Sequence, residues 1–103
     1  MDAEQKMLFL IQSFPVIRRG EGRRIKEWSG DFIVRKEGGL KDLYDKMSSS
    51  ECHVVEFALS VWNQNTDWTN YGYKPFQFAR AFARWDNGQR AAFCAWVEDP
   101  FFP

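Results

Sequence analysis

A cysteine, a histidine and a glutamate, Cys52, His53 and Glu56, stand close enough in the chain to suggest catalysis. A thiol enzyme needs a thiolate, a base and a group that orients the base. Because neighbouring residues on a helix point about 100° apart, Cys52 and His53 are poorly arranged as a pair. A thiol or hydrolytic enzyme is therefore the weakest of our three functional hypotheses, and we predict no catalytic residues. A buried Glu56 would need a partner such as an arginine, and an ion pair that fixes helix packing is favoured over catalysis.

Metal and cofactor chemistry lack their usual spacings in this chain. The two cysteines, Cys52 and Cys94, and the one histidine form neither a Cys-x-x-Cys nor a His-x-x-x-His pattern, so we predict no metal site and no cofactor. Both cysteines stand in apolar helical patterns, which favours two small buried hydrophobic side chains over a disulfide. Gly20-Glu21-Gly22 is not a phosphate-binding loop, which needs wider glycine spacing and a following lysine.

Basic residues gather between positions 18 and 26, where five of them accompany one acid and leave a local charge of +4. Arginine binds carboxylates and phosphates through two parallel hydrogen bonds, and a Gly-x-Gly tip lets a partner approach the backbone. This segment is our first candidate binding site. The competing interpretation is a solvated hairpin whose arginines pair with acids elsewhere in the chain. The candidate residues are Arg18, Arg19, Arg23 and Arg24.

A loop rich in aromatic and short polar residues is predicted at 63–74 and is our second candidate binding site. Its Trp68, Tyr71 and Tyr73 stand among Asn, Asp and Thr, a mixture found at recognition surfaces. The alternative is that Trp68 and one tyrosine fold back over the core.

The first half of the chain predicts a helix over 2–12, which Pro15 limits because the residue before a proline avoids helical dihedrals. Residues 16–26 suit either a hairpin or a mobile loop. The short run 31–36 lies between Ser29-Gly30 and two further glycines, which is the usual punctuation of a strand. We therefore expect a small β element, a hairpin or short strands, near residues 16–36.

The second half predicts helices more clearly. Apolar spacing indicates a helix over 40–47, and Ser48 and Glu51 form a capping-box pattern that starts a central helix over 49–62. A helical hairpin follows over 75–97, with its turn at 86–88 and with Arg80 and Arg84 opposite its apolar side. The tail after Pro100 should lie against the body. The predicted core is Val55, Leu59, Trp62, Phe78, Phe82, Trp85, Phe93 and Trp96.

Composition fits one mainly α domain over 1–103, with about five helices and the small β element. The chain has 103 residues, of which 17% are aromatic, enough for a workable core at this length. Lys plus Arg and Asp plus Glu are 14 each, so no cationic field covers the whole molecule. The apolar run 7–11 is too short for a signal peptide and no run could span a bilayer. We therefore expect a soluble cytoplasmic protein without a membrane partner.

These observations favour a small non-catalytic protein that binds another protein as an accessory, adaptor or inhibitor, of the kind that a phage or mobile element carries. Nucleic-acid binding through Arg18 to Arg24 is the alternative, with Trp28 or Tyr71 available for base stacking. The zero net charge counts against it. An excess of aromatic surface would also support homodimerisation.

Overall fold

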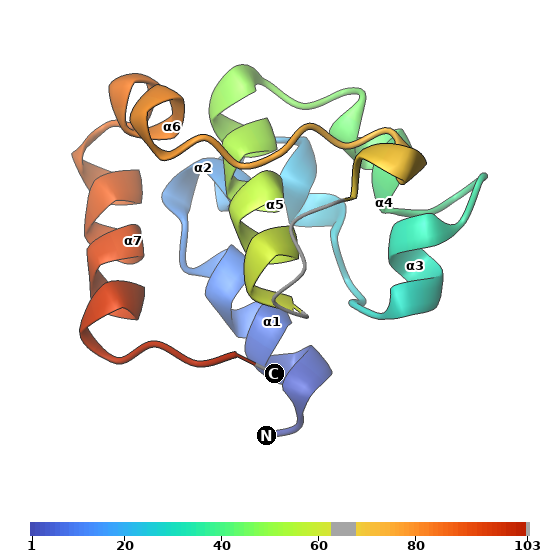
Figure 1. Ribbon diagram of the computed structural model, residues 1–103, viewed down its shortest axis with the longest axis horizontal. Coiled ribbons are helices and arrows are strands. Elements are labelled where there is room, and N and C mark those ends of the chain that lie inside the picture. Colours follow the sequence, from blue (N-terminus) through green and yellow to red (C-terminus); the bar gives the residue numbers. More distant parts are fainter. Residues whose placement is uncertain (63–67, 103) are drawn as a thin grey trace.

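The computed structural model of this chain describes residues 1–62 and 68–102 (Figure 1). Over these ranges it is a mainly helical domain with no strand, so the helical class is confirmed and the β element near residues 16–36 is wrong. The helices are α1 (Ala3–Gln12), α2 (Pro15–Arg19), α3 (Gly30–Val34), α4 (Leu40–Tyr44), α5 (Ser49–Trp62), α6 (Phe78–Arg84) and α7 (Asn87–Glu98). Two short 3-10 helices, η1 (Glu21–Arg24) and η2 (Thr69–Tyr71), complete the described elements.

The helix α5 runs through the middle of the fold, as Figure 1 shows, and contacts α1, α2, α4 and α6. Its predicted bounds and its capping box are both confirmed. The Ser48 hydroxyl accepts the Glu51 amide N–H at 3.4 Å, and the Glu51 carboxylate accepts the Ser48 N–H at 3.3 Å. A helix that is apolar on several faces must be surrounded by other elements. Its buried apolar residues are Val54, Val55, Phe57, Ala58, Leu59 and Val61.

A helix replaces the expected first strand because Pro15 both ends one helix and begins the next. Phe14 takes an extended conformation with φ −85° and ψ 117°, as a residue before proline should, and Pro15 occupies the first turn of α2. The amide N–H of Val16 then needs an acceptor from outside the helix. The side chain of Gln89 in α7 supplies it at 2.9 Å, so α2 is tied to the last helix of the chain.

The expected strand at 31–36 is also helical in its larger part, as α3. Its Ser29 is an N-cap, since the hydroxyl accepts the Phe32 amide N–H at 3.0 Å. Phe32 and Ile33 are both buried although they are adjacent, which the alternating faces of a half-buried strand would not allow. Serine followed by glycine was therefore the start of a helix rather than the boundary of a strand.

The last helical hairpin begins later than predicted, and this shift moves one phenylalanine to the surface. Residues 74–77, including Pro75, form no helix, and α6 begins at Phe78 after an extended Gln77. Phe76 consequently packs inward, with its ring 5.4 Å from that of Phe57 and 6.1 Å from that of Trp85. Phe78 is 52% exposed, so its place in the predicted core is wrong.

The rest of the predicted core lies inside the fold to differing degrees. Val55, Leu59 and Trp85 are buried, whereas Trp62, Phe82, Phe93 and Trp96 are partly buried and pack against the core. The tail also returns to the body, where Lys6 of α1 lies over the Phe101 ring at 6.0 Å. In the described part of the chain, no helix has the length and apolar character needed to cross a bilayer.

We expect Trp85→Ala to lower the free energy of unfolding by about 3–5 kcal/mol and Leu59→Ala by about 2–5 kcal/mol, because each change empties a fully enclosed site. Urea denaturation measures both losses. Phe9→Ala is the matched control, since this side chain is 69% exposed and its removal should change stability by less than about 0.5 kcal/mol. A core variant that unfolds like the wild type would show the core assignment to be wrong.

Candidate functional site

A cavity of about 720 Å³ lies between α4, α5 and the segment that leads from η2 into α6. In Figure 1 this segment crosses α5 on its way to α6. The volume is typical of sites that take small molecules or short peptide segments. The lining includes three cationic side chains, Lys74, Arg80 and Arg84. It also includes three more deeply buried polar side chains, Tyr44, His53 and Glu56.

The buried side of the cavity is a hydrogen-bonded network centred on Glu56, which is 4% exposed. The Tyr44 hydroxyl donates to one carboxylate oxygen at 2.6 Å, and His53 Nδ1 lies 2.9 Å from the other. In this pairing Nδ1 donates and the carboxylate oxygen accepts, an arrangement in which Nε2 of a neutral imidazole is an acceptor. Glu56 is therefore buried and paired, but its partners are a tyrosine and a histidine rather than an arginine.

The surroundings of Glu56 keep the Tyr44 hydroxyl and the Cys52 thiol protonated. Burial, and then the hydrogen bond to Glu56, raises the pKa of Tyr44, which stays a donor. Burial, and then the negative charge of Glu56, raises the pKa of the Cys52 thiol to about 11. The thiol donates weakly to the Tyr44 carbonyl oxygen at 3.5 Å. Since the thiolate is the reactive form, these surroundings argue against Cys52 as a nucleophile.

The cationic side of the cavity has no internal counterion. Among the described residues, no carboxylate lies within ion-pair distance of Lys74, Arg80 or Arg84, and the one exposed acid of the lining, Asp45, pairs with Lys41. Arg80 and Arg84 are four residues apart on α6 and so share one side of the helix. The cavity therefore presents positive charge to whatever enters it.

Sequence reasoning placed Arg80 and Arg84 on one side of their helix but did not connect them with His53 or Lys74. The spacing of the arginines was readable from the sequence. Their meeting with Lys74 depends on the course of residues 74–77 past α4 and α5, which no local pattern predicts.

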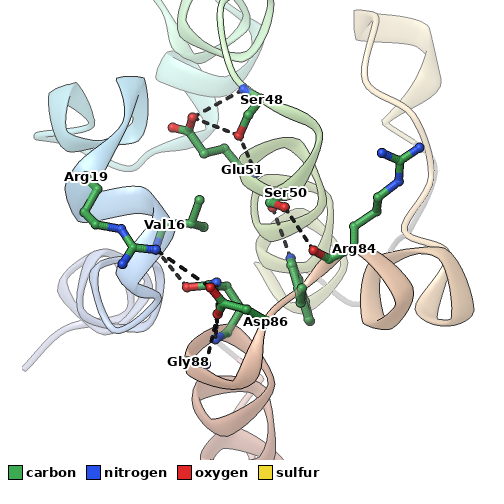
Figure 2. Close-up of polar contacts among 10 residues, drawn as sticks. Val16, Arg19, Ser48, Ser50, Glu51, Arg84, Asp86 and Gly88 are labelled. Carbon is green, nitrogen blue, oxygen red and sulfur yellow. Dashed lines mark hydrogen bonds and ion pairs between the residues drawn. The ribbon is translucent and has the colours of Figure 1, made fainter.

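The Arg-rich segment is occupied by contacts with its own chain. Arg18 donates to the Gln12 carbonyl at 2.6 Å and Arg23 to the Gly20 carbonyl at 2.9 Å. Arg24 pairs with Glu21 at 3.3 Å, and Arg19 faces Asp86 at 4.0 Å (Figure 2). These exposed side chains match the solvated alternative more closely than a prepared ligand site, although no hairpin forms.

The Gly-x-Gly tip of this segment does receive a carboxylate, and the carboxylate is that of Glu51. The Gly22 amide N–H donates to Glu51 at 2.8 Å, and the Ser48 hydroxyl donates to the other oxygen at 3.1 Å (Figure 2 shows the Ser48 side). A Cβ on Gly20 would collide with the same carboxylate. The close approach that glycine permits thus serves a buried internal acid.

Of the three aromatic candidate residues, one is exposed and two form hydrogen bonds with the body of the protein. Tyr71 is 49% exposed, whereas Tyr73 is 2% exposed and its hydroxyl donates to the Ile33 carbonyl at 2.7 Å. Trp68 is partly buried, and its indole N–H donates to the Leu59 carbonyl at 3.1 Å. Trp68 and Tyr73 therefore follow the alternative in which a tryptophan and a tyrosine cover the core, and Tyr73 leaves the candidate surface. Residues 63–67 of the predicted loop lie outside the described residues.

Two further sequence expectations need correction. Trp28, proposed for base stacking, is 2% exposed, so its ring is enclosed in the core. Cys94 is exposed rather than buried, because it lies on the outer side of α7, while Cys52 is partly buried and both thiols are free. Within the described ranges, no group of three or more His, Cys, Asp or Glu side chains is arranged to hold a metal ion.

Comparison with known proteins found no matching family model, no matching characterised protein and no matching solved structure.

We expect Gly20→Ala to destabilise the fold by about 1–3 kcal/mol, because the added methyl group displaces a carboxylate that three hydrogen bonds hold. Thermal unfolding measures the loss. Gly30→Ala is the control, since its added methyl group meets open space. Equal melting temperatures for the two variants would contradict the role assigned to Gly20.

Alkylation should distinguish the two thiols. At pH 8 we expect iodoacetamide to modify Cys94 and to leave Cys52 almost untouched, because a thiol whose pKa is raised to about 11 holds little thiolate there. The Cys94→Ser variant isolates Cys52, whose rate should climb only as the pH approaches 11. If Cys52 in that variant reacts at pH 8 as fast as a thiol in an unstructured peptide, its pKa is not raised and the assigned environment is wrong. Only a reaction faster than that of the free thiol would support the thiol-enzyme hypothesis.

Proposed function

We propose that this protein is a small non-catalytic binding protein, with an accessory, adaptor or inhibitor role, that docks on an acidic segment of a protein partner. The observation that carries the proposal is the cavity with three cationic side chains, Lys74, Arg80 and Arg84, which pair with no acid of residues 1–62 and 68–102. In a chain with equal numbers of acidic and basic residues, such a local excess of positive charge favours an acidic partner group.

The surroundings of the cavity fit a protein partner. The exposed Tyr71 directly precedes Gly72 of the lining, and tyrosine is enriched at protein interfaces, where its ring gives a large contact area with little loss of entropy. A cationic cavity with an exposed tyrosine next to its lining in the chain suits an acidic peptide segment that carries an apolar residue.

Nucleic-acid binding remains the alternative, and the contacts favour it less. Affinity for nucleic acid comes from a basic stripe that follows successive phosphates. The four arginines Arg18, Arg19, Arg23 and Arg24 already contact carbonyl or carboxylate oxygens of the chain, and Trp28 is enclosed. A phosphate would have to compete with these contacts, whereas the cations of the cavity are free to meet a ligand.

The first test compares an acidic probe with a nucleic-acid probe. We expect a fluorescent peptide of alternating aspartate and tyrosine to bind the wild type, and a single-stranded oligothymidine to bind more weakly, both followed by anisotropy. The variant Arg80→Glu with Arg84→Glu should weaken peptide binding at least tenfold, because it reverses the charge of one wall. Binding of the peptide should also weaken as salt is added.

The matched control reverses two arginines of the other candidate site, Arg18→Glu and Arg23→Glu, and should leave peptide affinity unchanged. Peptide binding that is equal in both double variants would refute the cavity as the docking site. Strong oligothymidine binding that disappears with Arg18→Glu and Arg23→Glu would replace the proposal with the nucleic-acid alternative.

A further inference from the structure

His53 differs from the three cationic side chains that line the cavity, because an imidazole can accept a hydrogen bond. Lysine and arginine only donate hydrogen bonds, so Lys74, Arg80 and Arg84 offer donors alone. The His53 ring donates from Nδ1 to Glu56 at 2.9 Å, and in the neutral form of the ring Nε2 then keeps a lone pair. Within the described residues, no donor is recorded for that nitrogen, and His53 lines the cavity. The cavity thus places cationic donors beside an acceptor that a buried carboxylate orients.

The acceptor is fixed in place by buried contacts. The His53 side chain is 17% exposed and the Glu56 side chain 3%. The second carboxylate oxygen of Glu56 is held by Tyr44 at 2.6 Å, and the Tyr44 oxygen accepts the Lys74 amide N–H at 3.3 Å. Because Glu56 has both oxygens engaged, the imidazole can neither rotate its Nδ1 away nor exchange its tautomer without breaking a buried hydrogen bond.

We propose that the cavity recognises a carboxylate with an N–H donor beside it, as an aspartate or glutamate within a peptide chain provides. In this arrangement the carboxylate meets Arg80, Arg84 and Lys74, and a backbone N–H of the same segment donates to Nε2 of His53. His53 is thus the specificity-determining residue and Glu56 the positioning residue. This inference rests on the proposed function and specifies the chemical groups that the docking site recognises.

A ligand without a donor fits this arrangement less well. A fully ionised phosphate or a simple dicarboxylate satisfies the cations but leaves Nε2 without a partner in a partly desolvated position, which lowers affinity. The same pairing of imidazole and carboxylate is used to orient histidines that bind metals. Here the described residues bring no second and third ligand to such an ion. A hydrogen-bond donor is therefore the group that matches Nε2.

The test is a double-mutant cycle between protein and peptide. One peptide is the acidic probe, with its C-terminus amidated, and the other carries N-methyl groups on the backbone nitrogens of its acidic residues. N-methylation should weaken binding to the wild type about tenfold, in keeping with the loss of about 1.4 kcal/mol when a buried acceptor is left unpaired. With His53→Phe, which keeps a flat ring but has no acceptor, N-methylation should make no difference.

Glu56→Gln tests the positioning role. The new amide group can donate to Nδ1, which turns Nε2 into a donor, so this variant should also lose the distinction between the two peptides. If either residue has a purely structural role, its substitution should weaken the binding of both peptides by the same factor. If His53→Phe does not fold, the tautomer can be measured in the wild type by long-range ¹H–¹⁵N correlation, which should show Nδ1 protonated and should show the Nε2 resonance moving on peptide addition.

The outcomes separate this inference from the proposed function. One outcome is that peptide binding depends on Arg80 and Arg84 while N-methylation lowers the affinity by the same factor in wild type and His53→Phe. In that case the docking function stands and the inference is refuted. If no acidic peptide binds, the proposed function itself fails. A peptide that binds only when its C-terminal carboxylate is free would also overturn the assignment.

Discussion

Two buried carboxyl groups on the central helix, those of Glu51 and Glu56, must be satisfied inside the fold, and the surrounding elements are arranged to do so. Glu51 accepts from Gly22 and from Ser48, whereas Glu56 accepts from Tyr44 and lies against His53. An unpaired buried charge would cost several kcal/mol, so each of these donors is required once α5 is enclosed. Through these hydrogen bonds η1 and α4 are held against α5, and the cavity beside Glu56 follows from the same requirement.

Local signals predicted the parts of the fold that local interactions determine. The capping box and the apolar faces were enough to place α5, and Asp2 with its capping box likewise starts α1. The β element is wrong because Ser29-Gly30 is also typical of a strand boundary and Pro15 also limits the preceding helix, whereas here each starts a helix. The need of Glu56 for a partner was predictable, but the identity of that partner was not, because Tyr44 comes from another helix.

In the candidate site, too, the features set by neighbouring residues were predictable, whereas those set by contacts between distant elements were not. The local excess of arginine at 18–26 was visible in the sequence, yet the acid that its glycines approach, Glu51, stands 29 residues away from Gly22. The three cations of the cavity are less conspicuous in sequence, since Lys74 is isolated and Arg80 and Arg84 resemble an ordinary solvated face. Only the path of the segment 74–77 brings them to the imidazole of His53.

The hydrogen bond between Val16 and the Gln89 side chain joins residues 73 positions apart, so it affects how the chain folds during its synthesis. Until Gln89 has been made, the first turn of α2 lacks its acceptor and Phe14 lacks the Trp85 ring that lies 5.4 Å away in the finished fold. Contacts of such separation require a large loss of chain entropy before they form. An N-terminal half on the ribosome therefore exposes apolar surface until α7 arrives, which makes chaperone contact or aggregation a hazard of synthesis rather than of the mature protein.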